Sequence, residues 1–190
     1  MAALAEKRKV LLHICCAPDA TVPWPELVDE GYETSGFFYG SNVHPYNEYE
    51  KRRDAVRHVA KIFGKRLFEA PYRPSEWIHG VATRCNGMEL IKEEGGPRCA
   101  LCFRSQFEAA AKCAVERDFD ALCTTLTISP HKKPDLVNGI GEALAKRHGL
   151  QWIQRIWRRR DGFRRSVLKS RELELYRQNY CGCVFSIRGE

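Results

Sequence analysis

An alternation of strand and helix patterns along the 190 residues constrains the fold more than any other feature. Strand patterns occupy residues 9–16, 36–39, 66–70, 121–126 and 151–156. Helix patterns separate or follow them, at residues 23–31, 46–63, 98–117, 136–148 and 166–177. Strands that alternate with helices predict an α/β fold, with one parallel sheet flanked by helices on both faces. We expect a single domain over residues 1–190, in which residues 1–8 are a flexible leader and residues 9–186 form the α/β domain.

Reactive side chains follow three of these strand patterns. Cys15 and Cys16 end the first strand, His44 lies in the polar loop after the second, and His131 lies in the loop after the fourth. Because ligands bind at the carboxyl ends of the strands in such sheets, we expect these residues at the ligand-binding edge. Each histidine either contacts substrate and transfers a proton, or caps a helix or holds a turn. The chain lacks G-x-x-x-x-G-K-[ST] and G-x-G-x-x-G, which argues against an ATPase or a dehydrogenase.

Six of the nine cysteines fall into three compact groups. The groups are Cys15-Cys16, Cys99-x-x-Cys102 and Cys181-Gly182-Cys183. Four converging thiolates suit zinc or an iron–sulfur cluster, and an adjacent pair on a buried strand is unlike the repeated knuckles of zinc sites. The spacing therefore favours iron–sulfur, although one C-x-x-C pair is also typical of redox motifs. We expect the isolated thiols to be buried and structural; they are Cys85, Cys113 and Cys123.

Asp19 follows the adjacent cysteine pair by three residues. One interpretation makes it a helix N-cap or turn residue, which is the common role of such an aspartate. The other makes it an iron ligand or a proton donor, because of the thiols beside it. The sequence leaves both interpretations open.

Basic residues outnumber acidic ones, and many gather in one run. Lys and Arg number 31 against 24 Asp and Glu, for a formal net charge of +7. The run carries Trp157 and Phe163 among its arginines, which are Arg155, Arg158, Arg159, Arg160, Arg164 and Arg165. Arginine with aromatic residues suits phosphate contact and base stacking, whereas a solvated charged face is the alternative. We expect this run, together with Lys132, to bind nucleic acid.

The sequence has no segment that approaches the ~20 apolar residues of a membrane span, and its first nine residues lack the apolar core of a signal peptide. We therefore expect a cytoplasmic protein without a membrane partner. In that compartment cysteines are more often ligands, redox thiols or buried apolar groups than disulfide partners.

These motifs together resemble one family closely, the cobalamin-independent epoxyqueuosine reductases (QueH). The family's Leu-His-x-Cys-Cys-Ala-Pro, Phe-Phe-Tyr and Asn-x-His-Pro-x-x-Glu-Tyr motifs match residues 12–18, 37–39 and 42–49. Its Arg-Cys-x-x-Cys-Phe, Thr-Thr-Leu-x-x-Ser-Pro-His-Lys and Leu-Tyr-Arg-Gln-x-Tyr-Cys-Gly-Cys-x-Phe-Ser motifs match residues 98–103, 124–132 and 175–186. The resemblance covers about residues 10–186.

The resemblance implies a fold similar to the adenine-nucleotide α-hydrolase-like (HUP, Rossmann-like) group and a 4Fe–4S cluster. Carried over by motif, the cluster ligands would be Cys15, Cys16, Cys99 and Cys102. Cys181 and Cys183 would form a redox-active disulfide or part of a second, mononuclear iron site with Asp19. Many members of that family have a further cysteine where this chain has Asp19, and a carboxylate is a harder ligand than a thiolate.

The implied reaction converts epoxyqueuosine in tRNA to queuosine, with electrons from an unidentified donor. Removing the epoxide oxygen takes two electrons and two protons, and His44 and His131 are candidate proton donors. Cys181 and Cys183 would supply the electron pair if they cycle between dithiol and disulfide. The alternatives from other classes are a zinc-stabilised nucleic-acid-binding module and a metal-free thiol oxidoreductase.

Overall fold

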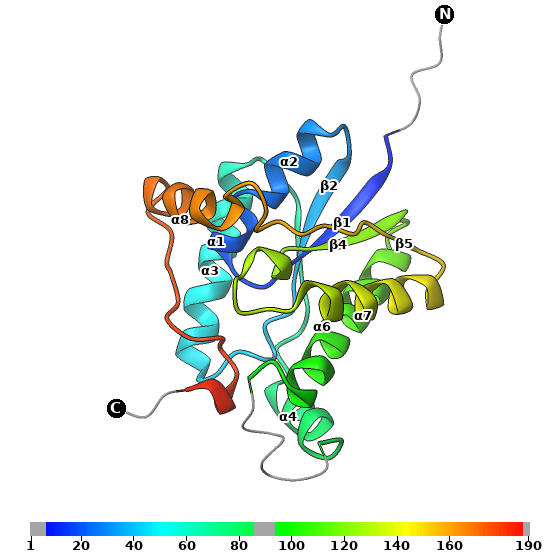
Figure 1. Cartoon of the computed structure of the whole chain (residues 1–190), viewed down its shortest axis with the longest axis vertical. Helices are drawn as coiled ribbons and strands as arrows, with labels where there is room; N and C mark the ends of the chain where they lie inside the picture. The colour runs from blue at the N-terminus through cyan, green and yellow to red at the C-terminus, as the bar shows by residue number, and fades with distance from the viewer. Residues whose placement is uncertain (1–6, 86–93, 188–190) are drawn as a thin grey trace, which may run out of the picture.

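The computed structural model describes residues 7–85 and 94–187. Within these ranges, five parallel strands form one sheet in the order β3-β2-β1-β4-β5 (Figure 1). The strands are β1 (Lys9–Ile14), β2 (Glu33–Phe38), β3 (Leu67–Glu69), β4 (Ala121–Thr124) and β5 (Gln151–Trp152). The central strand β1 pairs with β2 on one side and β4 on the other, so that Leu12 lies opposite both Gly36 and Cys123.

Helices cover both faces of this sheet (Figure 1). One layer consists of α1 (Ala17–Ala20), α2 (Pro23–Asp29), α3 (Tyr46–Ile62) and α8 (Gly162–Glu172). The other consists of α4 (Pro74–Ala82), α6 (Pro97–Val115) and α7 (Pro134–Arg147). Two short 3-10 helices, η1 (Leu126–Ile128) and η2 (Val184–Ser186), follow β4 and end the described chain. The fold class predicted from the alternating patterns is thereby confirmed.

Apart from Lys9 and His13, strand β1 is apolar, because it is buried from both sides. Val10, Leu12 and Ile14 pack into a core with Trp24 of the first layer. Leu11 points the other way, into a core that includes Ala110, Ala111 and Ala114 of α6. Successive residues of a strand face opposite sides of the sheet, so a continuous apolar run is what a central parallel strand requires.

Several elements differ from the sequence-based expectation: α1 is an unexpected short helix, β5 is shorter than predicted, and α4 and α8 differ as follows. Helix α4 lies in a stretch whose mixed pattern predicted no element; it begins at Pro74 and buries Trp77 and Val81. Helix α8 begins at Gly162 rather than at residue 166. Glycine is required at position 162 because a Cβ there would lie 1.7 Å from the carbonyl oxygen of Trp157. The chain then leaves the helical conformation, with Glu174 at a φ of 51°.

None of the described helices combines the length and the hydropathy that crossing a bilayer requires. The expected leader, residues 1–8, falls largely outside the described residues.

Two glycines on α7 provide a matched test of this packing. A Cβ at Gly141 would lie 2.2 Å from Cζ2 of Trp152, whereas a Cβ at exposed Gly139 would meet nothing within 4 Å. We expect Gly141→Ala to destabilise the protein by about 1–3 kcal/mol through overpacking. Gly139→Ala should instead stabilise it by about 0.5–1 kcal/mol, since alanine favours the helix. Urea denaturation followed by circular dichroism measures both, and equal effects would contradict the packing of α7 on Trp152.

Candidate metal centre

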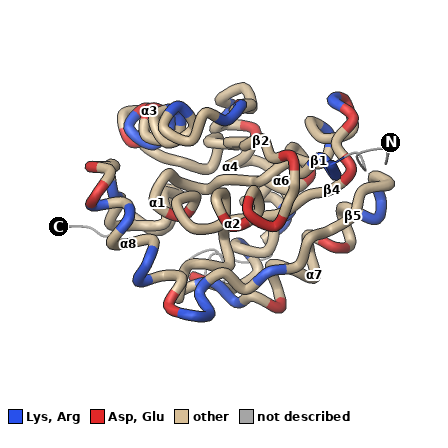
Figure 2. Tube along the Cα trace, turned by 90° about the horizontal axis from the view of Figure 1, so that it is seen from above, with Lys and Arg blue, Asp and Glu red and all other residues tan. Residues whose placement is uncertain are grey.

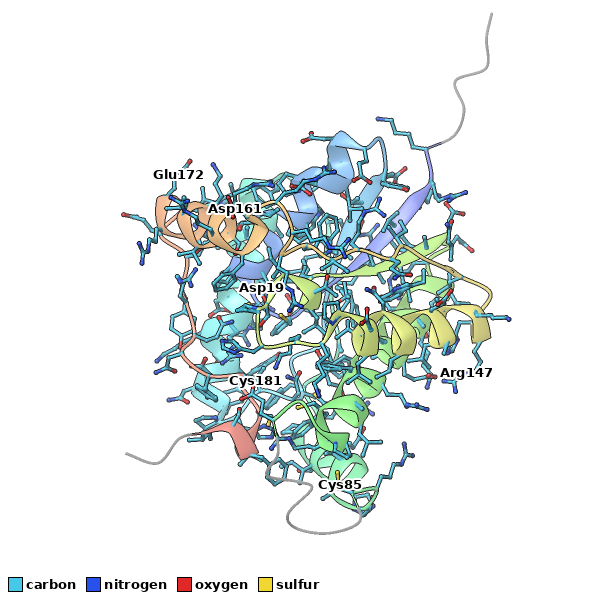
Figure 3. The ribbon with its side chains drawn as sticks, viewed as in Figure 1. Asp19, Cys85, Arg147, Asp161, Glu172 and Cys181 are labelled. Atoms are coloured by element: carbon cyan, nitrogen blue, oxygen red, sulfur yellow. The ribbon has the colours of Figure 1, made fainter. Side chains whose placement is uncertain are left out.

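A cavity of about 270 Å³ lies where the carboxyl ends of β1 and β4 meet the C-terminal segment. Figure 3 shows Asp19 on α1 and Cys181 on the segment that leads to η2, and both line this cavity. The reactive groups in its wall are Cys15, Asp19, Cys99, Cys102, Cys181, Cys183, His131 and Lys132. Segments far apart in the sequence therefore bring their thiols to one place, as expected for the ligand edge of a parallel sheet.

Cys15, Cys16 and Asp19 form one tight group on the β1–α1 turn. Their donor atoms all lie within 4.8 Å of one another, with 3.1 Å between Cys15 Sγ and Asp19 Oδ2. Hydrogen bonding with Cys16 and burial raise the pKa of Cys15, and burial raises the pKa of Asp19 despite hydrogen bonds from both thiols. Cys15 and Asp19 thus resist ionisation, and a bound cation would favour their charged forms. This donor set fits an iron ion.

Asp19 does not cap the helix on which it lies. The N-cap of α1 is Cys16, with no side-chain capping bond, and the Asp19 carboxylate instead accepts the hydrogen bond of the Cys15 thiol. The geometry therefore does not fit the N-cap interpretation and places the Asp19 carboxylate beside the two thiols.

The other four grouped cysteines form a second group in the same cavity, in which Cys99 also packs in a cluster that Cys15 adjoins. Cys99 and Cys102 lie in the first two turns of α6, and Cys102 packs in a cluster with Cys183. Burial and the nearby Cys181 and Cys183 raise the pKa of Cys102. The Cys181 sulfur accepts a hydrogen bond from Lys132 Nζ at 3.3 Å. Four thiols of this kind fit a cluster that takes one thiolate at each iron.

Two buried cations serve this second group. Arg98 is 1% exposed and Lys132 is 9% exposed. Burial lowers the pKa of each, but the thiols outweigh burial: Cys183 and Cys99 raise that of Arg98, and Cys181 raises that of Lys132. A cation beside a thiol favours the thiolate, the form that binds metal. The sequence led us to expect Lys132 to contact nucleic acid, whereas the structure places it in the wall of the cavity.

Side-chain amides donate to the cysteine sulfurs as well. Gln178 Nε2 lies 2.8 Å from Cys16 Sγ, and Gln106 Nε2 lies 3.1 Å from Cys102 Sγ. Hydrogen bonds to ligating sulfurs orient them and tune the metal that they hold. Sequence reasoning assigned no role to these glutamines or to Arg98, although Gln178 and Arg98 fall within motifs matched above.

The three histidines that lie in or after the strands β1, β2 and β4 occupy different environments. His131 is exposed and lines the cavity. His44 packs against Trp77 with ring centroids 5.4 Å apart, burial lowers its pKa, and its buried Nε2 has no hydrogen-bond partner among the described residues. His13 lies within β1, where Nδ1 is 2.9 Å from Thr124 Oγ1 and burial lowers its pKa to about 4. His13 is therefore a core residue, while the other two stay candidates for proton transfer.

The three isolated cysteines lie buried and outside the cavity lining, which agrees with a structural role; they are Cys85, Cys113 and Cys123. Burial raises the pKa of Cys123 to about 12.

The arginines of the basic run divide into two sets. Arg155 pairs with Glu30 at 2.6 Å, Arg165 pairs with Glu26, and Arg158 donates to backbone carbonyls that include that of Lys132, at 2.9 Å. The second set has no side-chain partner within the described part of the chain; it consists of Arg159, Arg160 and Arg164. Figure 2 shows Lys and Arg positions, in blue, along the stretch between the labels α8 and α7.

Phe163 connects this basic surface to the cavity. Its side chain is 39% exposed, and among the exposed large apolar residues of the described chain it alone lines the cavity. A half-exposed aromatic ring beside unpaired arginines suits contact with an unstacked base.

Known proteins match this chain over nearly its whole length. The model of the family "Epoxyqueuosine reductase QueH" matches residues 10–189. The epoxyqueuosine reductase QueH of Streptococcus pyogenes serotype M1 is 34% identical over 99% of this chain and 75% of its own length. The one from Thermotoga maritima is 35% identical over 94% of this chain and 90% of its own.

Solved structures agree in fold. A predicted subunit of tRNA methyltransferase from Methanocaldococcus jannaschii matches with a TM-score of 0.57 at 15% identity, covering 83% of this chain and 73% of that one. The U34-tRNA thiolase NcsA from Methanococcus maripaludis, solved with its [4Fe-4S] cluster, matches with a TM-score of 0.54 at 14% identity, covering 94% and 60%. Given the family match and the two relatives above, the chain belongs to the epoxyqueuosine reductase QueH family.

Proposed function

We propose that this protein reduces epoxyqueuosine in tRNA to queuosine. The observation that carries the proposal is the convergence of five of the grouped cysteines and Asp19 on one cavity, with Cys16 directly beside Cys15. The reaction consumes two electrons and two protons, breaks both C–O bonds of the epoxide, leaves an alkene and releases the oxygen as water. The electron pair comes from a cellular reductant that remains to be identified.

Two sets of residues would hold iron. Cys99, Cys102, Cys181 and Cys183 would bind a 4Fe–4S cluster, because all four line the cavity, Cys181 and Cys183 lie near Cys102, and the buried Arg98 and Lys132 lie near Cys99 and Cys181. Cys15, Cys16 and Asp19 would bind a single iron, since their donor atoms already lie within reach of one ion. This division follows the geometry and groups the residues differently from the division implied by motif alone. When bound, the cluster would supply electrons singly, and the single iron would supply Lewis acidity.

The protein's own side chains would prepare the substrate. Trp77, Phe103 and Leu126 give the cavity apolar walls, which exclude water from the reacting groups. His131 lines the cavity and would deliver a proton, with His44 as the second candidate. Lys132 would orient Cys181 by donating a hydrogen bond to its sulfur.

The tRNA would enter over the unpaired arginines. A modified base must leave its stack to enter the cavity, and the exposed ring of Phe163 in the cavity lining would stack on it or on a neighbour. Arg159, Arg160 and Arg164 would contact phosphates. Neither alternative, a zinc-stabilised binding module or a metal-free thiol oxidoreductase, is favoured, because the family match spans residues 10–189.

The reaction itself is tested with anaerobically reconstituted protein, epoxyqueuosine-containing tRNA and a strong reductant. We expect mass analysis of the digested nucleosides to show queuosine, one oxygen lighter than its precursor. Protein without added iron is the control and should leave the precursor intact. If the protein holds its cluster but converts no substrate, the proposed function is wrong.

The assignment of Cys183 as a ligand makes a separate prediction. Cys183→Ser should lower both the iron bound per chain and the activity, because a hydroxyl is a poor substitute for thiolate at iron. Cys113→Ser, on α6 but outside the cavity, is the matched control and should change neither. Full activity with unchanged iron content in the Cys183 variant would refute both its ligand role and a disulfide cycle with Cys181.

Binding of tRNA should depend on the unpaired arginines more than on the paired ones. Changing Arg159, Arg160 and Arg164 together to Gln should weaken tRNA binding. The slope of the logarithm of the binding constant against the logarithm of the salt concentration should become shallower by about two to three, because each phosphate contact contributes roughly 0.7–0.9 to that slope. The control changes Arg155 and Arg165 to Gln, which leaves the unpaired set intact. Filter binding at several salt concentrations measures the slopes, and salt-independent binding would contradict an electrostatic interface.

A further inference from the structure

The segment that carries Cys181 and Cys183 has no regular secondary structure of its own. Residues 175–183 lie between the turn after α8 and η2, outside any helix or strand. Its position over the cavity therefore depends on contacts with other elements. The backbone N–H of His44 donates to the carbonyl oxygen of Gly182 at 2.7 Å, which ties it to the loop before α3.

Arg52 makes the most extensive of these contacts. From the buried face of α3 it donates through Nη1 to the carbonyl oxygen of Cys181 at 2.9 Å and through Nη2 to that of Tyr180 at 3.0 Å. Its guanidinium also lies 5.1 Å from the centre of the Tyr180 ring. One rigid, planar group thus fixes two successive carbonyls, a geometry that the single ammonium of lysine cannot reproduce.

The guanidinium is itself held in place from behind. Nε donates to Glu48 Oε1 at 2.7 Å, and the other Glu48 oxygen accepts from the Tyr176 hydroxyl at 2.6 Å. The Arg52 and Glu48 side chains are only 3% and 8% exposed. All three guanidinium nitrogens are therefore engaged in one buried network that begins and ends on the C-terminal segment.

Gly182 packs directly against the Arg52 guanidinium of this network. Its φ of +104° is one that residues with a side chain rarely adopt, and a Cβ there would lie 2.5 Å from Arg52 Nη1. The residue between the two cysteines must thus be glycine because the guanidinium occupies the space beside it.

We propose that Arg52 is a positioning residue that holds the Cys181-Gly182-Cys183 loop so that both thiols face the cavity. The ion pair with Glu48 lies within α3 and could exist without reaching the loop, and buried ion pairs contribute little net stability. An ion pair that served only stability would need no contact with the loop, yet Arg52 donates to two of its carbonyl oxygens. The chemical use of the thiols rests on the proposed function, but their placement by Arg52 does not.

Metal-free protein tests the placement directly. Arg52→Lys keeps the charge but loses the two-carbonyl contact, and Gly182→Ala disturbs the same contact from the loop side. In both variants we expect alkylation of Cys183, which is 4% exposed in the native fold, to accelerate by roughly tenfold through local opening. Peptide mass spectrometry gives the rate for each cysteine, so Cys113 and Cys123 serve as internal controls in the same molecule.

Three outcomes are decisive for Arg52. Faster alkylation at Cys181 and Cys183, with Cys113 and Cys123 unchanged, supports the proposal. Unchanged Cys183 reactivity in both variants overturns it. Acceleration at all four cysteines also overturns it, because Arg52 would then only stabilise the fold as a whole.

Iron bound per chain after anaerobic reconstitution then separates this inference from the proposed function. Selective loop opening with a loss of iron supports both. Selective opening with unchanged iron content supports the positioning role and counts against Cys181 and Cys183 as ligands.

Discussion

The burial of β1 on both faces is the constraint on which the rest of the structure depends. A strand paired on each side and covered by helix layers on each face can end at only one place, the middle of the sheet's carboxyl edge. The next two residues are Cys15 and Cys16, so the reactive turn inherits its position from the core. β4, beside β1, likewise places the loop with Lys132 at the same edge.

The cavity combines thiols that resist ionisation with cations that favour it. Burial raises the pKa of Cys15, Asp19 and Cys102, whereas Arg98 and Lys132 stay charged within reach of the second thiol group. Metal binding would therefore release protons and be weakened by acid. The surface arginines have a different role: the unpaired ones face solvent, and those paired with Glu26 and Glu30 join α8 and the segment before it to α2.

Periodicity and motifs were enough to predict the fold class and to single out the grouped cysteines, because both are written in local patterns. The proposed division of ligands was not predictable, since it rests on how the α6 N-terminus and the C-terminal segment meet in space. Helix α4 was not predicted because nine residues give only a short pattern, in which helix and strand are hard to tell apart. The sequence contains one indication of the role of Arg52, because this charged residue lies on the apolar face of α3 with Tyr49, Val56 and Val59. The carbonyls that it binds could not be predicted, since they lie more than 120 residues further along the chain.

The origin of the thiols in distant segments has a consequence for chain entropy. Cys99 and Cys102 lie at the start of α6, whereas Cys181 and Cys183 precede the last described turn. A cluster held by these four thiols would act as a cross-link between α6 and the C-terminal segment and restrict the unfolded ensemble, much as a long-range disulfide does. Loss of metal would then lower the cooperativity with which the C-terminal segment stays attached to the sheet, well before the sheet itself opens.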